Sequence, residues 1–177
     1  MIQLPQNQIT DIKAFLYDGK PAFLYNPQNI PWFYEKHEIE ALKQYPFVGS
    51  IVSHTISGLI MYFQDEMKRT TFLEAIRGLE VNSPEYHEQI GIALGYPPKA
   101  ARFYSLFIQD EERFRCKKVG IQFNGCGCIG HVEDIEDNVR WLWERYPESW
   151  YHKRDLEIAY TPKKGVPSTW YNIPYQD

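Results

Sequence analysis

The chain has 177 residues, of which 44% are hydrophobic and 24% charged, a composition typical of one soluble globular domain. Its formal net charge of −4 argues against a protein that mainly coats nucleic acid, because such binding depends on Lys and Arg neutralising phosphates. Three cysteines, an odd number, do not fit a secreted domain stapled by disulfides.

The first third of the chain predicts short elements followed by two strands. Prolines punctuate residues 1–33, which we expect to hold short elements joined by turns, and residues 35–44 predict a short helix. The stretch 45–63 contains no Asp, Glu, Lys or Arg and is nearly long enough to span a membrane. Its proline, glycines, serines and histidine make it too polar for lipid. We therefore expect two short buried strands there, at 47–52 and 57–63.

Helical signals dominate the middle of the chain. Apolar residues recur at helical spacing over residues 65–79. Ser83 followed by Pro84 is typical of a helix start, and Gly95 is typical of the end of that helix. Residues 97–109 predict a further helix.

The last third alternates strand and helix signals. Residues 118–123 and 156–160 predict strands, and residues 135–146 predict an amphipathic helix with an exposed Glu136–Arg140 pair. Residues 161–177 are expected to form an irregular tail. Because helices and strands do not alternate strictly, we expect one α+β domain over residues 1–177. Its small mixed or antiparallel sheet would pack with about four to five helices.

The segment 124–131, Asn-Gly-Cys-Gly-Cys-Ile-Gly-His, is the most unusual in the chain. We interpret it as a sharp turn from the strand at 118–123 into the helix at 135–146. Glycine suits such a turn because it tolerates positive φ. The turn would leave backbone N–H groups free at the rim of a ligand pocket.

Two cofactor interpretations compete for the same residues. Residues 125–130 match Gly-x-Gly-x-x-Gly, the dinucleotide-binding pattern, but few residues remain after it to build the rest of a parallel sheet. Gln122, Gly125 and Gly127 spell Gln-x-x-Gly-x-Gly, which resembles the acetyl-CoA loop of the GNAT acetyltransferases. That resemblance implies an acyltransferase whose cofactor pyrophosphate meets a helix start.

A metal site and a reactive thiol are further alternatives. Cys116, Cys126, Cys128 and His131 form a ligand set that tetrahedral zinc accepts, although the usual Cys-x-x-Cys knuckle is missing. We expect no essential metal and no cofactor. A thiolate of Cys126 or Cys128 activated by His131 would instead serve catalysis, whereas we favour a protein that is not an enzyme.

Residues 84–108 have the skeleton of a helix-turn-helix, with Gly91 four residues before Gly95. The second helix would present Lys99 and Arg102 to DNA. Two basic residues in an acidic chain make DNA an unlikely partner. We expect this segment to pack as a structural corner.

These observations favour a cytoplasmic, non-catalytic binding protein, with GNAT-like acyltransferase and DNA-binding regulator as alternatives. A small, acidic, aromatic-rich chain is typical of sequestering, inhibitory or anti-defence modules of phages and prophages. Its partner would be a small nucleotide-like ligand or another protein, and self-association is left open. The residues expected at the ligand site are Phe123, Asn124, Gly125, Gly127, Gly130, Tyr104, Arg102 and Trp141.

Overall fold

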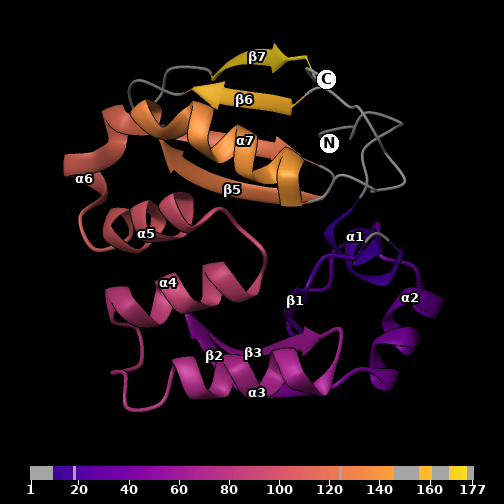
Figure 1. Ribbon diagram of the computed structural model, residues 1–177. Helices are drawn as coiled ribbons and strands as arrows, with labels where there is room; N and C mark the ends of the chain where they lie inside the picture. Colours follow the sequence, from indigo (N-terminus) through magenta and orange to yellow (C-terminus); the bar gives the residue numbers. More distant parts are fainter. Residues whose placement is uncertain (1–9, 18, 124, 146–155, 161–167, 175–177) are drawn as a thin grey trace.

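The structure is a computed structural model that describes residues 10–17, 19–123, 125–145, 156–160 and 168–174. Seven α-helices and two antiparallel sheets, of three and four strands, make up this described part (Figure 1). The predicted α+β class is confirmed. The chain builds two small sheets where we expected one, because its seven strands fall into two separately paired groups.

The first sheet has the strand order β1-β3-β2, with β1 at Ala22–Tyr25, β2 at Phe47–Ser53 and β3 at Ile56–Phe63. The hairpin of β2 and β3 confirms the two predicted strands, although most of β2 is not buried. Helix α1 (Asp11–Tyr17) and helix α2 (Lys36–Ala41), which continues into a 3-10 turn at Leu42–Gln44, share a small apolar core with β1. The helix predicted at 35–44 is therefore confirmed.

Three helices follow: α3 (Glu66–Ala75), α4 (Pro84–Ala93) and α5 (Pro98–Phe107). The cap expected at Ser83 is present, since its side chain accepts from Tyr86 N at 3.2 Å, and Asp65 caps α3 by accepting from Lys68 N at 2.8 Å. Helix α3 ends four residues before the predicted end, ahead of a turn in which Gly78 has a φ of +77°.

The second sheet has the order β5-β4-β6-β7, with β4 at Lys118–Phe123, β5 at Cys126–His131, β6 at Leu156–Tyr160 and β7 at Thr169–Ile173. A short helix, α6 (Glu111–Phe114), and a 3-10 turn at Arg115–Lys117 precede β4. A second 3-10 turn, Val132–Asp134, leads into α7 (Ile135–Arg145), which covers one face of the sheet (Figure 1). The strands at 118–123 and 156–160 and the helix at 135–146 are confirmed, as is the Glu136–Arg140 pair at 2.8 Å.

The expectation of an irregular tail over 161–177 is wrong for its middle. Residues 169–173 form β7, which pairs with β6 from Tyr160↔Thr169 to Leu156↔Ile173. The segment is rich in strand formers, but Trp170 and Tyr171 are more than half exposed. An exposed edge strand gives no alternation of buried and polar residues, and so the usual sequence signal is missing. Residues 161–167 and 175–177 lie outside the described part.

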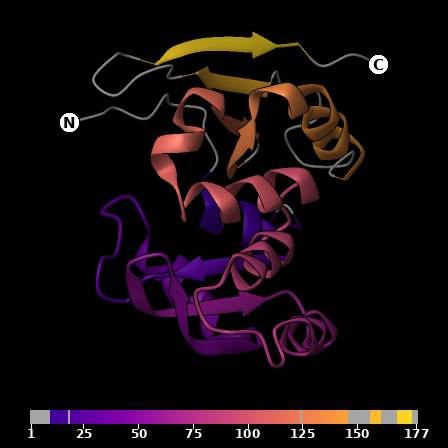
Figure 2. The same ribbon diagram turned by 90° about the vertical axis from the view of Figure 1, so that its left-hand side faces the viewer.

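Helices α4 and α5 lie between the two sheets (Figure 2). Each sheet has its own apolar core, and the half-buried ring of Tyr96, in the α4–α5 turn, packs against both. The ammonium of Lys20 also joins the two halves by donating to the carbonyl oxygen of Gly125 at 3.4 Å. In the part of the chain that the structure describes, no helix is both long and apolar enough to cross a membrane.

Candidate functional site

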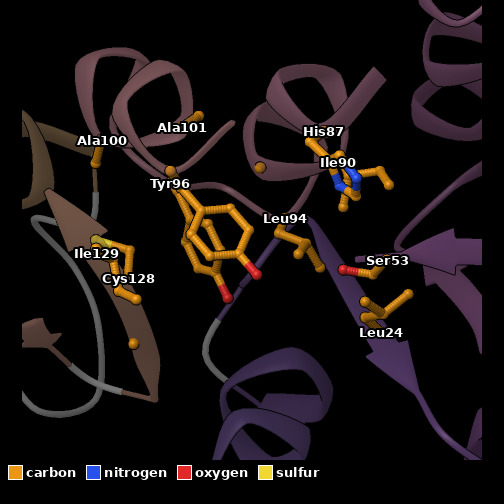
Figure 3. Close-up of a pocket in the computed structure, with 13 residues that line it drawn as sticks. Leu24, Ser53, His87, Ile90, Leu94, Tyr96, Ala100, Ala101, Cys128 and Ile129 are labelled. Carbon is orange, nitrogen blue, oxygen red and sulfur yellow. The ribbon is translucent and has the colours of Figure 1, made fainter. Parts of the chain in front are cut away.

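A cavity of about 300 Å³ lies where α4 and α5 meet both sheets. Figure 3 shows Leu24 and Ser53 of the first sheet on one side and Cys128 and Ile129 of β5 on the other, with Tyr96 drawn between them. Its volume is at the lower end of the range of small-molecule sites. The lining residues are Leu24, Ser53, His87, Ile90, Gly91, Leu94, Tyr96, Ala100, Ala101, Tyr104, Gly127, Cys128 and Ile129.

One face of α4 and the helix crossing shape the cavity. His87, Ile90, Gly91 and Leu94 follow the spacing i, i+3, i+4, i+7, which places them along one side of the helix. A Cβ atom on Gly91 would lie 2.8 Å from the Cβ of Ala101. Only glycine therefore lets α5 approach α4 this closely.

His87 is the most informative polar residue in the cavity. Its side chain is 1% exposed, and its Nε2 lies 2.6 Å from Oδ1 of Asn82. Because that oxygen only accepts, Nε2 carries the proton and Nδ1 is left with a free lone pair. Among the described residues, Nδ1 has no hydrogen-bond partner. Burial, and then the nearby His54, lower the pKa of His87 below 6.5, which keeps the ring neutral at pH 7.

The remaining polar groups of the cavity are hydroxyls and a thiol. Burial raises the pKa of Tyr96 and of Tyr104, and a hydrogen bond with the Ser53 hydroxyl lowers the latter by a smaller amount. Burial likewise raises the pKa of the Cys128 thiol. Among the residues that the structure describes, no Asp, Glu, Lys or Arg lines the cavity, so its described lining carries no charge at neutral pH.

The residues expected at the ligand site do not all come together. Tyr104 and Gly127 line the cavity, whereas the ring of Phe123 is buried in the core of the second sheet. Trp141 lines a different groove, and Arg102 is exposed on α5. The three aromatic residues expected at the ligand site, Phe123, Tyr104 and Trp141, therefore do not line one pocket. Asn124 lies outside the described residues.

The segment 124–131 is not a turn from strand to helix. Residues 126–131 form β5, which pairs with β4 from Phe123↔Cys126 to Lys118↔His131. Only Gly125 of its three glycines has positive φ, +72°. A Cβ atom would meet the Gln122 side chain at Gly127 and the Asn138 side chain at Gly130. These two glycines allow close approach, and our conformational explanation of them is wrong.

The hairpin also means that neither cofactor pattern lies where a strand passes into a helix. A diphosphate loop needs glycines where a strand passes into a helix start. Here β5 and a 3-10 turn separate the glycines from α7, and Gln122 pairs across the hairpin with Gly127. Of the residues that resemble the GNAT loop, Gln122 and Gly127 thus lie in two paired strands and Gly125 lies in the turn between them.

The four candidate metal ligands do not form one cluster. Alternation along β5 buries Cys126 and Cys128 on one face and places His131 on the other, against the ring of Phe103. Cys116 is exposed. In the described residues, no group of three or more His, Cys, Asp or Glu is arranged to hold a metal ion. The same alternation separates His131 from the thiols that the catalytic alternative would have it activate.

The helix-turn-helix skeleton is present as a packed corner. Helix α5 lies against β5, and Phe103, on the face expected to meet DNA, is 6% exposed. Lys99 contacts the carboxylates of Asp134 and Asp137 at 3.1 and 2.5 Å. Arg102 remains exposed on this face.

Comparison with known proteins assigns no family to these features. No family model matches the chain, no curated protein matches it, and no solved structure matches it. The function is therefore argued from the geometry of the cavity.

Proposed function

We propose that the chain is a cytoplasmic, non-catalytic binding protein that sequesters a small, flat, uncharged nucleotide-like ligand, such as a nucleobase or nucleoside. Two observations carry the proposal: His87 lines a cavity of about 300 Å³, and its buried Nδ1 has no hydrogen-bond partner among the described residues. The phage-type sequestering role expected from composition is part of the same proposal.

The acceptor on His87 requires a ligand with a hydrogen-bond donor. A buried polar group without a partner costs about 1–3 kcal/mol, and an N–H of a base removes that cost by donating to Nδ1. The apolar side chains of Leu24, Ile90 and Leu94 would contact the faces of a flat ring. Ser53 and Tyr104 are half-buried and offer hydroxyls at their end of the cavity.

The uncharged lining favours a base or nucleoside over its phosphates. A phosphate group inside the cavity would lose its hydration without meeting a Lys or Arg among the described lining residues, which is costly. The same lining favours binding over catalysis, because Tyr96, Tyr104 and Cys128 all hold their protons more tightly than usual. In the described part of the chain, neither a carboxylate nor an activated nucleophile lines this space.

The test is calorimetric titration of the protein with adenine, guanine, cytosine and uracil, their nucleosides and their monophosphates. At least one base or nucleoside should bind, and its monophosphate should bind more weakly. In His87→Gln the side-chain amide reaches the place of Nε2 and keeps a donor to Asn82, but the acceptor at Nδ1 is lost. His87→Asn is the matched variant, because its oxygen takes the place of Nδ1.

We expect His87→Gln to weaken binding about tenfold or more, the effect of one unpaired buried group, and His87→Asn to weaken it less. Urea unfolding of both variants checks that each is folded. The proposal is wrong if no base or nucleoside binds, if monophosphates bind more tightly, or if folded His87→Gln binds as the parent does.

A further inference from the structure

A second concave surface, which we call the α3–α4–α7 groove, has a volume of about 360 Å³. Its floor includes the buried rings of Phe63 and Phe72, and Trp141 of α7 forms part of its wall. Its described lining contains two cations, Lys68 of α3 and Arg145 of α7, and no Asp or Glu. The three helices lie on the same side of the molecule (Figure 2).

We propose that this groove binds a small organic anion, with a flat apolar body on the floor and one carboxylate or phosphate between Lys68 and Arg145. The site is separate from the cavity and does not depend on its ligand.

The first support for this proposal is the exposed apolar surface around the groove. Met67 is 73% exposed and Ile92 is 41% exposed beside the half-buried ring of Trp141. Scattered apolar residues are ordinary on a protein surface, but here they surround a concave floor of phenylalanine rings. A flat ring system suits this surface, because it can stack on the indole of Trp141 or contact the edge of that ring.

The second support is the positive charge of the side chains that line the groove. The chain carries a net charge of −4, yet this groove has two cations and no carboxylate in its lining. Lys68 contacts Asp65 outside the lining, which offsets part of its charge. No ion pair of Arg145 is found in the described part of the chain. Its planar guanidinium is suited to bind a carboxylate or phosphate through two parallel hydrogen bonds.

The apolar floor and the cations together exclude simpler ligands. An inorganic anion would leave the floor unused, and a neutral ring compound would leave Arg145 without a partner from the ligand. Gln89 of α4 also lines the groove and offers an amide that can donate to an anion. An amphiphilic anion is the ligand class that uses every part of the lining.

The test compares 2-naphthoate with 2-naphthalenemethanol, its uncharged counterpart, by calorimetric titration at low ionic strength. We expect 2-naphthoate to bind about tenfold more tightly, since a hydrogen bond to a charged group is worth about 1.5–3 kcal/mol. Arg145→Gln should abolish this preference. Arg140→Gln is the matched control. Arg140 is on the same helix and is not among the lining residues of the groove, and its substitution removes the same charge.

Trp141→Leu should weaken both ligands alike, because it removes stacking surface and leaves the cations in place. Saturation with the nucleoside that fills the cavity should leave 2-naphthoate binding unchanged. Equal affinity for the charged and uncharged ligands, or equal losses in Arg145→Gln and Arg140→Gln, would overturn the proposal. Displacement of 2-naphthoate by the nucleoside would place the anion in the cavity and overturn it as well.

Discussion

The cavity and the α3–α4–α7 groove lie on opposite faces of one helix. His87, Ile90 and Leu94 of α4 face the cavity, while Gln89, Ile92 and Ala93 face the groove. The described lining of the cavity is uncharged and its polar groups are buried or half-buried, whereas the groove carries two cations in its lining. A ten-residue helix can thus separate two surfaces of different chemistry, a division that the net charge of the whole chain conceals.

The two surfaces should respond to different variables. Binding in the cavity depends on which nitrogen of His87 carries a proton, so it should respond to pH. Binding in the groove depends on exposed cations, and salt screens these over a Debye length of about 8 Å at physiological ionic strength. Each prediction below changes one surface and uses the other as a reference.

The largest effect is expected from Gly91→Ala, which acts where α4 and α5 cross. The new Cβ would lie 2.8 Å from Ala101 Cβ and 3.2 Å from its Cα, so the helices must move apart. Overpacking of this kind costs about 1–3 kcal/mol, measured by urea unfolding, and binding in the cavity should fall more than binding in the groove.

Gly49→Ala is the control, because no atom lies within 4 Å of its new Cβ. Its free energy of unfolding should stay within about 0.5 kcal/mol of the parent. Equal stability of Gly91→Ala and the parent would contradict the close crossing that shapes the cavity.

A smaller effect is expected from Gly130→Ala, in the strand that forms one wall of the cavity. Its Cβ would meet Nδ2 of Asn138 at 2.9 Å, and Asn138 is only 1% exposed, so it has little room to move. We expect a loss of about 1 kcal/mol on urea unfolding. Gly127→Ala meets the end of the exposed Gln122 side chain, which can swing away, and should cost less. The reverse order would contradict the packing of β5 against α7.

The pH prediction follows from the lowered pKa of His87. Burial, then His54, favour the neutral ring in the folded state, whereas the unfolded ring titrates near 6.5. The unfolded state therefore binds more protons below pH 6.5, and stability is lost as the pH falls from 6.5 toward the folded pKa. Urea unfolding from pH 7.5 to 5 should show this loss, and His87→Asn should reduce it.

Ligand binding gives the second readout of the same titration. A protonated Nδ1 cannot accept, so nucleoside affinity should fall with the pH. The affinity of the groove for 2-naphthoate should hold, because no His, Asp or Glu is among its described lining residues. A parallel fall of both affinities would point to a general loss of structure.

The sequence predicted those elements whose signal is local. The strand at 118–123 and the helix at 135–146 were found from periodicity, and the start of α4 from Ser83 and Pro84. The hairpin was missed although Asn124-Gly125 is a strong two-residue turn signal, because the glycines after it suggested a loop. Gly127 and Gly130 allow close approach of residues from other elements, which a pattern along one strand does not reveal.

The candidate site was harder to predict because it joins distant segments. Tyr104 and Gly127 were expected at a ligand site and do line the cavity, but their role in binding stays a prediction. His87 was missed, although it lies three residues before Ile90 on the apolar face of the predicted helix. Its free nitrogen depends on how Asn82 and α5 surround it, which only the folded chain shows.

The last prediction is that the protein does not bind duplex DNA. The face of α5 that would enter a groove of DNA has Phe103 buried, and its Lys99 contacts Asp134 and Asp137. These two carboxylates would repel phosphates, leaving Arg102 as the one unopposed cation of the predicted pair. Micromolar protein should not shift a duplex in a gel at 50 mM salt, and the double variant Lys99→Ala, Arg102→Ala should behave identically. A shift that weakens with salt and disappears in the double variant would show that α5 reads DNA, and the corner between the sheets would then be an interface.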